Sequence, residues 1–280
     1  MELDIEHKPS QAAVFGVTRL HVKARTLGRL EIPVFGASMI RGAVGHALLQ
    51  RYCHCETPTG HEPGCLYARL FDTELGNAFV ITPPEPGERR ASEYFAFDVS
   101  LLETDGQLHD AFLSALESGL AHGLGAAAVP CELAQISPST CGVVPLDGHA
   151  VLRLTSPWFT KHRNQPLNAQ TFTIHSLLVG AAQRQRQLVQ QRWLNAEIPE
   201  NVELLQLADQ LQVESELVDV RSERRSNRQN RKHPVQGVSG VFRVSHPEPQ
   251  GLAPVSALLS RAQWVHGGAK VSFGLGGLSV

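Results

Sequence analysis

Alternating hydrophobic and polar positions mark the first predicted strand, residues 14–25. One face of this strand is apolar and the other basic, because Leu20, Val22 and Ala24 alternate with His21, Lys23 and Arg25. A glycine- and serine-containing turn then precedes a helical pattern over 39–53, with Ser38 as its expected N-cap. Strands are also predicted at 77–86, 94–102 and 131–136, and a helix at 109–119. This β-α-β-β-α-β order is typical of a ferredoxin-like unit.

The second half of the chain repeats this order loosely. We expect strands at 150–154, 235–244 and 270–280, and helices at 168–193, 202–212 and 254–260. The predicted fold class is therefore α+β, with tandem ferredoxin-like (RRM-like) βαββαβ domains. Proline, glycine and aspartate cluster at 140–148 and place the boundary there, which gives domains over 1–145 and 146–280. A helical insertion is expected at about 168–220.

Amino-acid composition and net charge limit the classes of protein that fit this sequence. The 280 residues are 42% hydrophobic, enough for a buried core, and 25 basic side chains against 27 acidic ones give a net charge of −2. A total near zero excludes indiscriminate, histone-like binding to nucleic acid. The N-terminal residues 1–10 are polar, and no run of 18 apolar residues occurs, so we expect a cytoplasmic protein without a membrane partner.

Charge is unevenly distributed in the second half. Residues 221–233 hold six basic side chains against one acid, 181–192 hold three arginines and no acid, and 193–220 hold seven acids and no base. Basic tracts of this kind suit binding to a phosphate backbone, although a solvated loop is the alternative. The predicted RNA-binding residues in these tracts are Arg184, Arg186, Arg192, Arg224, Arg225, Arg228, Arg231 and Lys232, and Arg243 follows them.

A glycine-rich segment closes the chain. Residues 266–277 contain five glycines, which allow a backbone to approach a ligand closely and expose N–H groups to an anion. Such loops are also common as tight turns, so this signal is weak alone. We expect a glycine-rich loop over 267–277 whose RNA-binding residues are Gly267, Gly268, Lys270, Ser272, Phe273, Gly274 and Gly276.

The combination of these motifs is more specific. A basic Ser-Asn-Arg-Gln-x-Arg-x-His-Pro tract leads to Gly237-Val-Ser-Gly240, then a hydrophobic helix, then Trp264-Val-His-Gly-Gly-x-Lys-x-Ser-Phe-Gly-Leu-Gly. This order resembles the CRISPR-associated RAMP endoribonucleases that cut precursor crRNA within its repeats. The resemblance covers 224–280 and, more weakly, 33–71, where Phe35-Gly-Ala-Ser-Met-Ile-Arg and Cys65-Leu-Tyr-Ala-Arg-Leu-Phe resemble the family's first-helix region.

The resemblance implies two ferredoxin-like folds in tandem and a glycine-rich loop that contacts RNA. It implies binding to the crRNA repeat hairpin and metal-independent cleavage that leaves a 2′,3′-cyclic phosphate. It also implies that the product stays bound and joins other subunits of a CRISPR effector complex. The long stretch at 168–220 resembles the type IV members, which carry a helical insertion that grips the repeat hairpin.

Candidate catalytic residues follow from this chemistry, which needs a base, an acid and a cation near the phosphate. The family often places a catalytic histidine in or near the first helix, and His46 lies there. On a helical projection, Arg41 and His46 flank a face made bare by Gly42 and Gly45. Arg25, on the basic face of the first strand, completes the expected catalytic set, with a solvated edge face as the equal alternative for that strand. The alternative for His46 is a partly buried residue at the rim of a close helix contact.

Two other versions of the site stay open. One is an arginine-based site that uses Arg25, Arg41 and Arg243, because some family members lack an obvious histidine dyad. The other uses His266 beside the glycine-rich loop, although Trp-Val-His-Gly is more typical of a structural turn.

Five cysteines do not form a secreted disulfide framework. Cys53, Cys55 and Cys65, with His61, could ligate zinc, but the usual Cys-x2-Cys spacing is absent, so free thiols on a loop are the favoured interpretation. We therefore expect no metal and no cofactor, and buried structural roles for Cys131 and Cys141. Besides the endoribonuclease, two functions stay open: a non-catalytic crRNA-binding subunit, and a zinc-containing structural protein that binds a protein partner.

Overall fold

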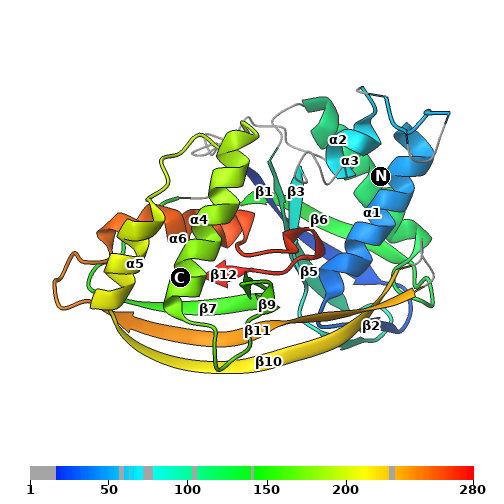
Figure 1. Ribbon diagram of the computed structural model, residues 1–280. Helices are drawn as coiled ribbons and strands as arrows, with labels where there is room; N and C mark the ends of the chain where they lie inside the picture. The colour runs from blue at the N-terminus through cyan, green and yellow to red at the C-terminus, as the bar shows by residue number, and fades with distance from the viewer. Residues whose placement is uncertain are drawn as a thin grey trace.

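Figure 1 shows the computed structural model of the chain. It describes residues 17–56, 60–62, 64–71, 78–102, 106–139, 142–226 and 231–280, and at 223–226 and 231–234 the backbone alone. The start of the first predicted strand at 14–16, Cys141 and Arg228 therefore lie outside the described residues.

The first half contains a four-stranded antiparallel sheet. Its strands β1 (Thr18–Thr26), β3 (Phe79–Thr82), β5 (Tyr94–Leu101) and β6 (Cys131–Ser139) lie in the order β3-β5-β1-β6. Helices α1 (Gly36–Tyr52) and α3 (Gly106–His122) cover one face, where Val22, Ile40 and Phe112 share one buried core. The shorter elements are α2 (Leu66–Phe71) and the paired strands β2 (Leu30–Ile32) and β4 (Gly87–Arg89).

The second half has the same strand order. Strands β7 (His149–Trp158), β10 (Gln212–Ser226), β11 (Arg231–Ser245) and β12 (Leu278–Ser279) form the sheet β10-β11-β7-β12. Helices α4 (Ile174–Gln190) and α6 (Ala253–Val265) pack on this sheet, and α5 (Asn201–Gln210) contacts α4. A small hairpin of β8 (Lys161–His162) and β9 (Gln165–Pro166) follows β7. Two sheets of equivalent order confirm the predicted tandem ferredoxin-like fold.

Two local expectations were wrong. Helix α1 begins at Gly36 with Phe35 as its N-cap residue, and the Ser38 hydroxyl donates to the Phe35 carbonyl at 2.9 Å instead of capping the helix. The expected strand over 270–280 is a 3-10 helix (Val271–Phe273) followed by the short β12. Glycines with positive φ at 274 and 276 break the extended backbone there.

The region expected as a helical insertion also differs from the prediction. Helix α4 is a sheet-packing element of the ferredoxin-like unit, because Leu177, Leu178 and Ala181 are buried in the second core. Only α5 is additional, and residues 212–220 belong to strand β10 rather than to a helix. The protruding element is therefore the β10–β11 hairpin, which Figure 1 shows as a long ribbon running from the second half toward the first.

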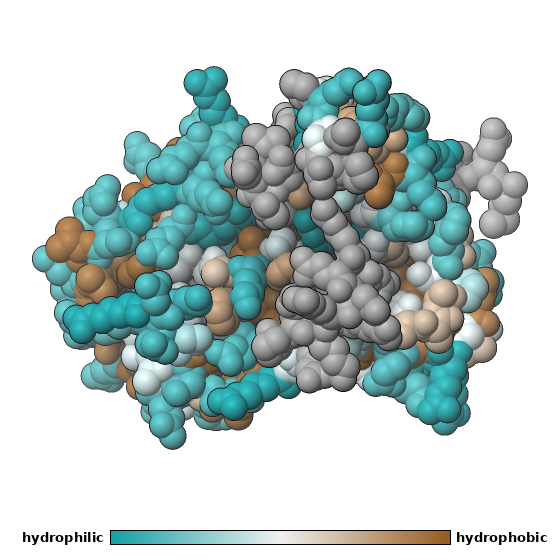
Figure 2. Space-filling model, turned by 45° about the vertical axis from the view of Figure 1, so that its right-hand side comes forward, coloured by the Kyte–Doolittle hydropathy of each residue, from teal (hydrophilic) through white to brown (hydrophobic). Residues whose placement is uncertain are grey.

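Specific contacts join the two halves. The buried His266, directly after α6, accepts a hydrogen bond from the Thr82 hydroxyl of β3 at 3.0 Å, and Arg19 of β1 donates to the Gln263 carbonyl of α6 at 3.1 Å. On the face that Figure 2 presents, hydrophobic residues form separate small groups among hydrophilic ones. None of the helices in the described part of the chain is long and apolar enough to cross a membrane.

Candidate active site and RNA interface

His46 lies on the exposed side of α1. Gly42, one helical turn earlier, is also exposed, and a Cβ built there would meet no atom within 4 Å. Residues at i and i+4 share a helix face, so the His46 imidazole stands beside an open stretch of helix backbone. This part of the α1 surface is therefore open, and a catalytic role for His46 stays a prediction.

The rest of the expected glycine face is covered. A Cβ at Gly45 would lie 2.7 Å from Cε1 of Phe71, so the α2 phenyl ring packs directly on the α1 backbone there. The Arg41 guanidinium stacks on the same ring, with its carbon 4.2 Å from the Phe71 centroid and 5.0 Å from that of Phe79. Phe71 therefore fixes Arg41 and closes half of the face that the helical projection left bare.

Arg25 does not join His46 and Arg41. Successive side chains of a strand point to opposite faces, and Ala24 is buried against the helices, so Arg25 projects from the other face of the sheet. There its guanidinium binds Glu132 of β6, with Nε 3.2 Å from Oε2. This hydrogen bond and the Glu132 charge raise the pKa of Arg25. The expected catalytic set is therefore split between two faces of the first sheet.

The remaining cations of that face also have partners. His21 and Arg19 both contact Asp98, at 2.8 and 2.7 Å, and Lys23 lies over the Tyr94 ring at 4.5 Å. Burial raises the pKa of Asp98, but the hydrogen bonds and charges of Arg19 and His21 outweigh it and leave that pKa lowered. This basic face is an ion-paired outer surface of the sheet.

The structure also does not bring together the arginine-based site or a site around His266. Arg243 is exposed between the buried Phe242 and Val244, and it pairs with Glu216 of β10 at 2.6 Å on the outer face of the second sheet. His266 is fully buried, and burial lowers its pKa to about 4. A neutral, enclosed imidazole of this kind has a structural role, which is the interpretation of the Trp-Val-His-Gly turn that the sequence favoured.

The basic tract lies at the end of the β10–β11 hairpin. Pairing is continuous from Gln212 with Ser245 to Ser226 with Arg231, so the backbone carries 224, 225, 231 and 232 to its far end. Below that end, Val235 belongs to one buried cluster with Phe35, the N-cap residue of α1, and Val220 packs against this cluster. The hairpin thus brings the tract from the second half to the start of the helix that carries His46.

The glycine-rich loop serves packing more than ligand binding. A Cβ at Gly267 would lie 2.2 Å from the Trp158 ring, and one at Gly276 would lie 1.9 Å from the Gly267 carbonyl oxygen. Gly274 and Gly277 are buried, and Gly268, Ser272 and Phe273 are half-buried. Among the expected RNA contacts of this loop, Lys270 is the exposed side chain. The expectation of several contacts through the glycines was wrong for the buried ones.

Lys270 belongs to a cationic cluster that the sequence pattern did not reveal. Its ammonium lies 4.3 Å from the centroid of Phe159, and burial, then the charge of Lys161, lowers its pKa. Lys161 begins the β8–β9 hairpin, whose exposed tip holds His162 and Arg163. The signal was the run Lys-His-Arg-Asn at 161–164, a polar turn with positive φ at 163 and 164. Phe159 shares its buried cluster with Phe35, so these cations also lie near the start of α1.

Two of the three arginines at 181–192 are structural. Arg184 is 3% exposed, donates to the Gln187 amide oxygen at 3.1 Å, and has its pKa lowered by burial to about 10. Arg186 binds the Asn201 side chain at 2.8 Å and the Pro199 carbonyl, so it holds the connection between α4 and α5. Arg192 remains exposed. The buried Arg184 is therefore not available for the predicted RNA contact, whereas the half-buried Arg186 is held by protein partners and its RNA contact stays a prediction.

The three cysteines and the histidine at 53–65 converge more closely than their spacing suggested. One ligand atom from each of Cys53, Cys55, His61 and Cys65 lies within 4.8 Å of all the others. A backbone hydrogen bond from Cys55 lowers the pKa of Cys53, whereas burial raises that of Cys65. Cys131 is buried, as expected, and burial raises its pKa to about 11.

Comparisons with known proteins connect this architecture to one group of structures. A family model described as AF_1859_N, N-terminal domain, matches residues 15–153. No curated protein matches the chain. A Cas6 product complex is 16% identical with a TM-score of 0.60, and Thermus thermophilus Cas6 is 14% identical with a TM-score of 0.56. These matches cover 94% and 95% of this chain and 98% of the other chain in each case.

A partial Cas6-RT-Cas1–Cas2 complex matches with a TM-score of 0.61 and 14% identity, over 94% of this chain and 45% of the longer one. Identities this low establish the fold alone. The chain has the tandem ferredoxin-like fold of the Cas6 structures.

Proposed function

We propose that this protein is an endoribonuclease that binds the repeat hairpin of precursor crRNA and cleaves it without a catalytic metal. The mature crRNA then stays bound, and the complex associates with other CRISPR effector subunits. The observation that carries the proposal is the β10–β11 hairpin. It delivers the arginine tract to the end of α1 that precedes Gly42 and His46, through the shared cluster of Phe35 and Val235.

Binding rests on cations that the structure leaves at the surface. The side chains of Arg192, Lys161, Arg163 and Lys270 are exposed, and the hairpin end carries the basic tract. Arginine and lysine bind phosphate through charge and hydrogen bonds, so these side chains can contact the backbone of the RNA hairpin. The acids at Glu132, Asp98 and Glu216 neutralise the cations of the outer sheet faces instead.

Cleavage is an internal transfer at phosphorus. The 2′-oxygen loses its proton to a base and bonds to phosphorus, the bond to the 5′-oxygen breaks, and that oxygen takes up a proton. The products are a 2′,3′-cyclic phosphate and a 5′-hydroxyl, with no water consumed. His46 is the described group best placed for proton transfer, because it is exposed beside the open backbone at Gly42.

Charge stabilisation of the phosphorane requires a cation. Arg41 is on the same helix, but its guanidinium is held over Phe71 and Phe79. We assign this role to the hairpin tract, with Arg41 as the fixed positive charge behind it. Arg25 has no part in this version, because its side chain lies on the other face of the sheet.

The experiment is incubation of the protein with its repeat RNA in EDTA, followed by analysis of the product ends. A cyclic-phosphate end that appears without added metal supports the proposal. Tight binding without cleavage would instead identify a crRNA-binding subunit. This alternative is consistent with the position of Arg25 and His46 on different faces of the first sheet. Absence of affinity for RNA at moderate salt would reject both functions.

The CRISPR subtype is a separate part of the proposal. The helical insertion that suggested type IV is reduced to α5, so the fold gives this subtype little support. Repeats and effector genes beside the coding sequence would assign the subtype directly, and size-exclusion chromatography of the cleaved complex would show whether product stays bound.

A further inference from the structure

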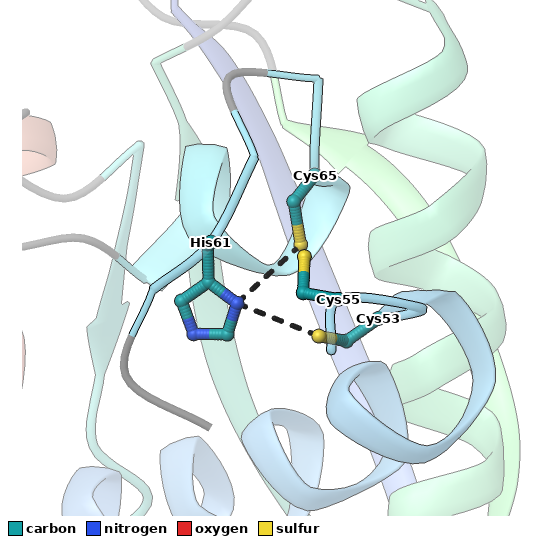
Figure 3. A group of neighbouring side chains, drawn as sticks. All are labelled: Cys53, Cys55, His61 and Cys65. Atoms are coloured by element: carbon teal, nitrogen blue, oxygen red, sulfur yellow. Dashed lines mark hydrogen bonds between the residues drawn. The ribbon is translucent and has the colours of Figure 1, made fainter. Parts of the chain in front are cut away.

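We infer that Cys53, Cys55, His61 and Cys65 form a structural zinc site that fastens α2 onto α1. Figure 3 shows the four side chains pointing toward one another from the end of α1 and the connection to α2. All four are described residues, and none of them belongs to the proposed catalytic or RNA-binding set. The inference is independent of the proposed function.

The distances suit a tetrahedral ion. Zinc binds thiolate sulfur at about 2.3 Å and imidazole nitrogen at about 2.0–2.1 Å, so tetrahedral edges measure roughly 3.8 Å between two sulfurs and 3.6 Å between sulfur and nitrogen. Nδ1 of His61 lies 3.4 Å from Sγ of Cys53 and 3.8 Å from Sγ of Cys65, and no pair among the four ligand atoms exceeds 4.8 Å. A zinc ion at their centre therefore requires only small side-chain adjustments.

The donor set selects the metal. Three thiolates and one imidazole are soft ligands that favour zinc over calcium or magnesium. Four protein ligands fill the coordination shell and leave no open position for water, which is the arrangement of a structural site rather than a catalytic one. Such an ion would be compatible with RNA cleavage that needs no catalytic metal.

Neighbouring groups support these ligands. The backbone N–H of Glu62 donates to Sγ of Cys55 at 3.4 Å, a contact that stabilises a thiolate. The His61 ring packs against Tyr67, with centroids 5.1 Å apart, and this contact orients its Nδ1 toward the sulfurs. The cluster thus has an outer layer that holds the ligand atoms in place.

The site lies at the junction between α1 and α2. Cys53 directly follows α1, and Cys65 directly precedes α2, whose six residues are too few for an independently stable helix. From α2, Tyr67 stacks on Phe71 at 5.3 Å, and Phe71 covers Gly45 and Arg41. Zinc would therefore hold the aromatic contact that sets the surface of α1 next to His46.

The test is metal analysis of the full chain purified without added zinc or chelator. We expect about one zinc per chain, and a spectrum with thiolate-to-cobalt charge transfer when Co²⁺ replaces it. Cys55→Ser and His61→Ala should each lower the zinc content at least several-fold. Cys131→Ala is the matched control, because Cys131 lies on β6 outside the cluster, and it should retain the full content.

A second measurement covers ligand variants that do not fold. Stripping the parent protein with a strong zinc chelator should lower its Tm, and added Zn²⁺ should restore it. Parent protein that contains less than a tenth of a zinc per chain, and that shows no cobalt spectrum and no Tm shift with Zn²⁺, would overturn the inference. Because these readouts involve no RNA, they stand or fall separately from endoribonuclease activity.

Discussion

Thr82 and His266 are joined by a 3.0 Å hydrogen bond that crosses from the first sheet to the glycine-rich loop of the second half. The other imidazole nitrogen, Nδ1, lies 2.9 Å from the Leu275 carbonyl oxygen and donates to it. Nε2 is therefore the acceptor, and the ring is neutral in a fully buried site. A protonated ring could not accept the Thr82 hydrogen bond, so this contact between the two halves requires the neutral imidazole.

Stability should therefore fall as the pH falls from about 6.5 to about 4. Burial, the largest cause, lowers the pKa of His266 from 6.5 to about 4, so in this window the unfolded chain binds a proton that the folded chain does not. The stabilisation is complete above pH 6.5, and roughly 3 kcal/mol of it is lost by pH 4. Urea unfolding across this range measures the slope. His266→Gln should flatten that slope, and an equal slope in both proteins would contradict the assignment.

Two glycines of α1 should respond in opposite ways to alanine. Gly42 faces open space, so Gly42→Ala should raise the free energy of unfolding by about 0.5–1 kcal/mol through helix propensity. Gly45→Ala should lower it, because the new Cβ would meet the Phe71 ring at 2.7 Å. If RNA lies against the backbone beside His46, Gly42→Ala should also slow cleavage despite its greater stability. Unchanged cleavage would show that RNA does not approach there.

The hairpin tract should dominate the salt dependence of RNA binding. Replacing Arg224, Arg225, Arg228 and Arg231 together by glutamine should reduce the log–log slope by about 0.7–0.9 for each phosphate that the variant no longer binds. Arg186→Gln is the contrasting variant: its partners are Asn201 and the Pro199 carbonyl, so it should lower stability and leave the slope unchanged. A slope that responds to Arg186 but not to the tract would move the RNA to another face.

The cluster at Lys161 and Lys270 should contribute a smaller share. Lys161→Ala with Lys270→Ala should weaken RNA binding and reduce the same slope by up to about 1.4–1.8, the value for two phosphates. Arg29→Ala is a suitable control, because it removes an exposed cation that pairs with Glu88. If Arg29→Ala weakened RNA binding as much as the Lys161 and Lys270 double variant, the lysine cluster would contribute only non-specific positive charge and no direct phosphate contact.

Periodicity predicted most of the fold because most elements bury one face. Strand β1 and helices α1 and α3 were found from residues such as Val22, Val44 and Leu116, which form the first core. Strand β10 was missed because it is the edge of its sheet and is exposed on both faces over 212–216, so its sequence carries no burial pattern. The extended conformation of β10 is stabilised by pairing with β11, and a local sequence pattern does not encode this pairing.

The candidate site was only partly predictable for a related reason. Helical spacing placed His46 beside Gly42, but it could not show that Phe71 of another helix covers Gly45 and Arg41. The charge of Arg184 suggested RNA, whereas burial assigns it to the core. Spacing also understated the cysteine cluster, because His61 and Cys65 lie close in space to Cys53 and Cys55. In each of these three examples, the environment of the side chain depends on contacts between segments that are distant in the sequence.

The single-turnover cleavage rate of His46→Ala on repeat RNA in EDTA tests the central claim most directly. His149→Ala, which removes an exposed histidine at the start of β7, is the matched control. At saturating protein, we expect His46→Ala to bind RNA as the parent does and to cleave it at least about 10²-fold more slowly. The control should cleave at the parent rate. A His46→Ala variant that cuts as fast as the parent would contradict the account.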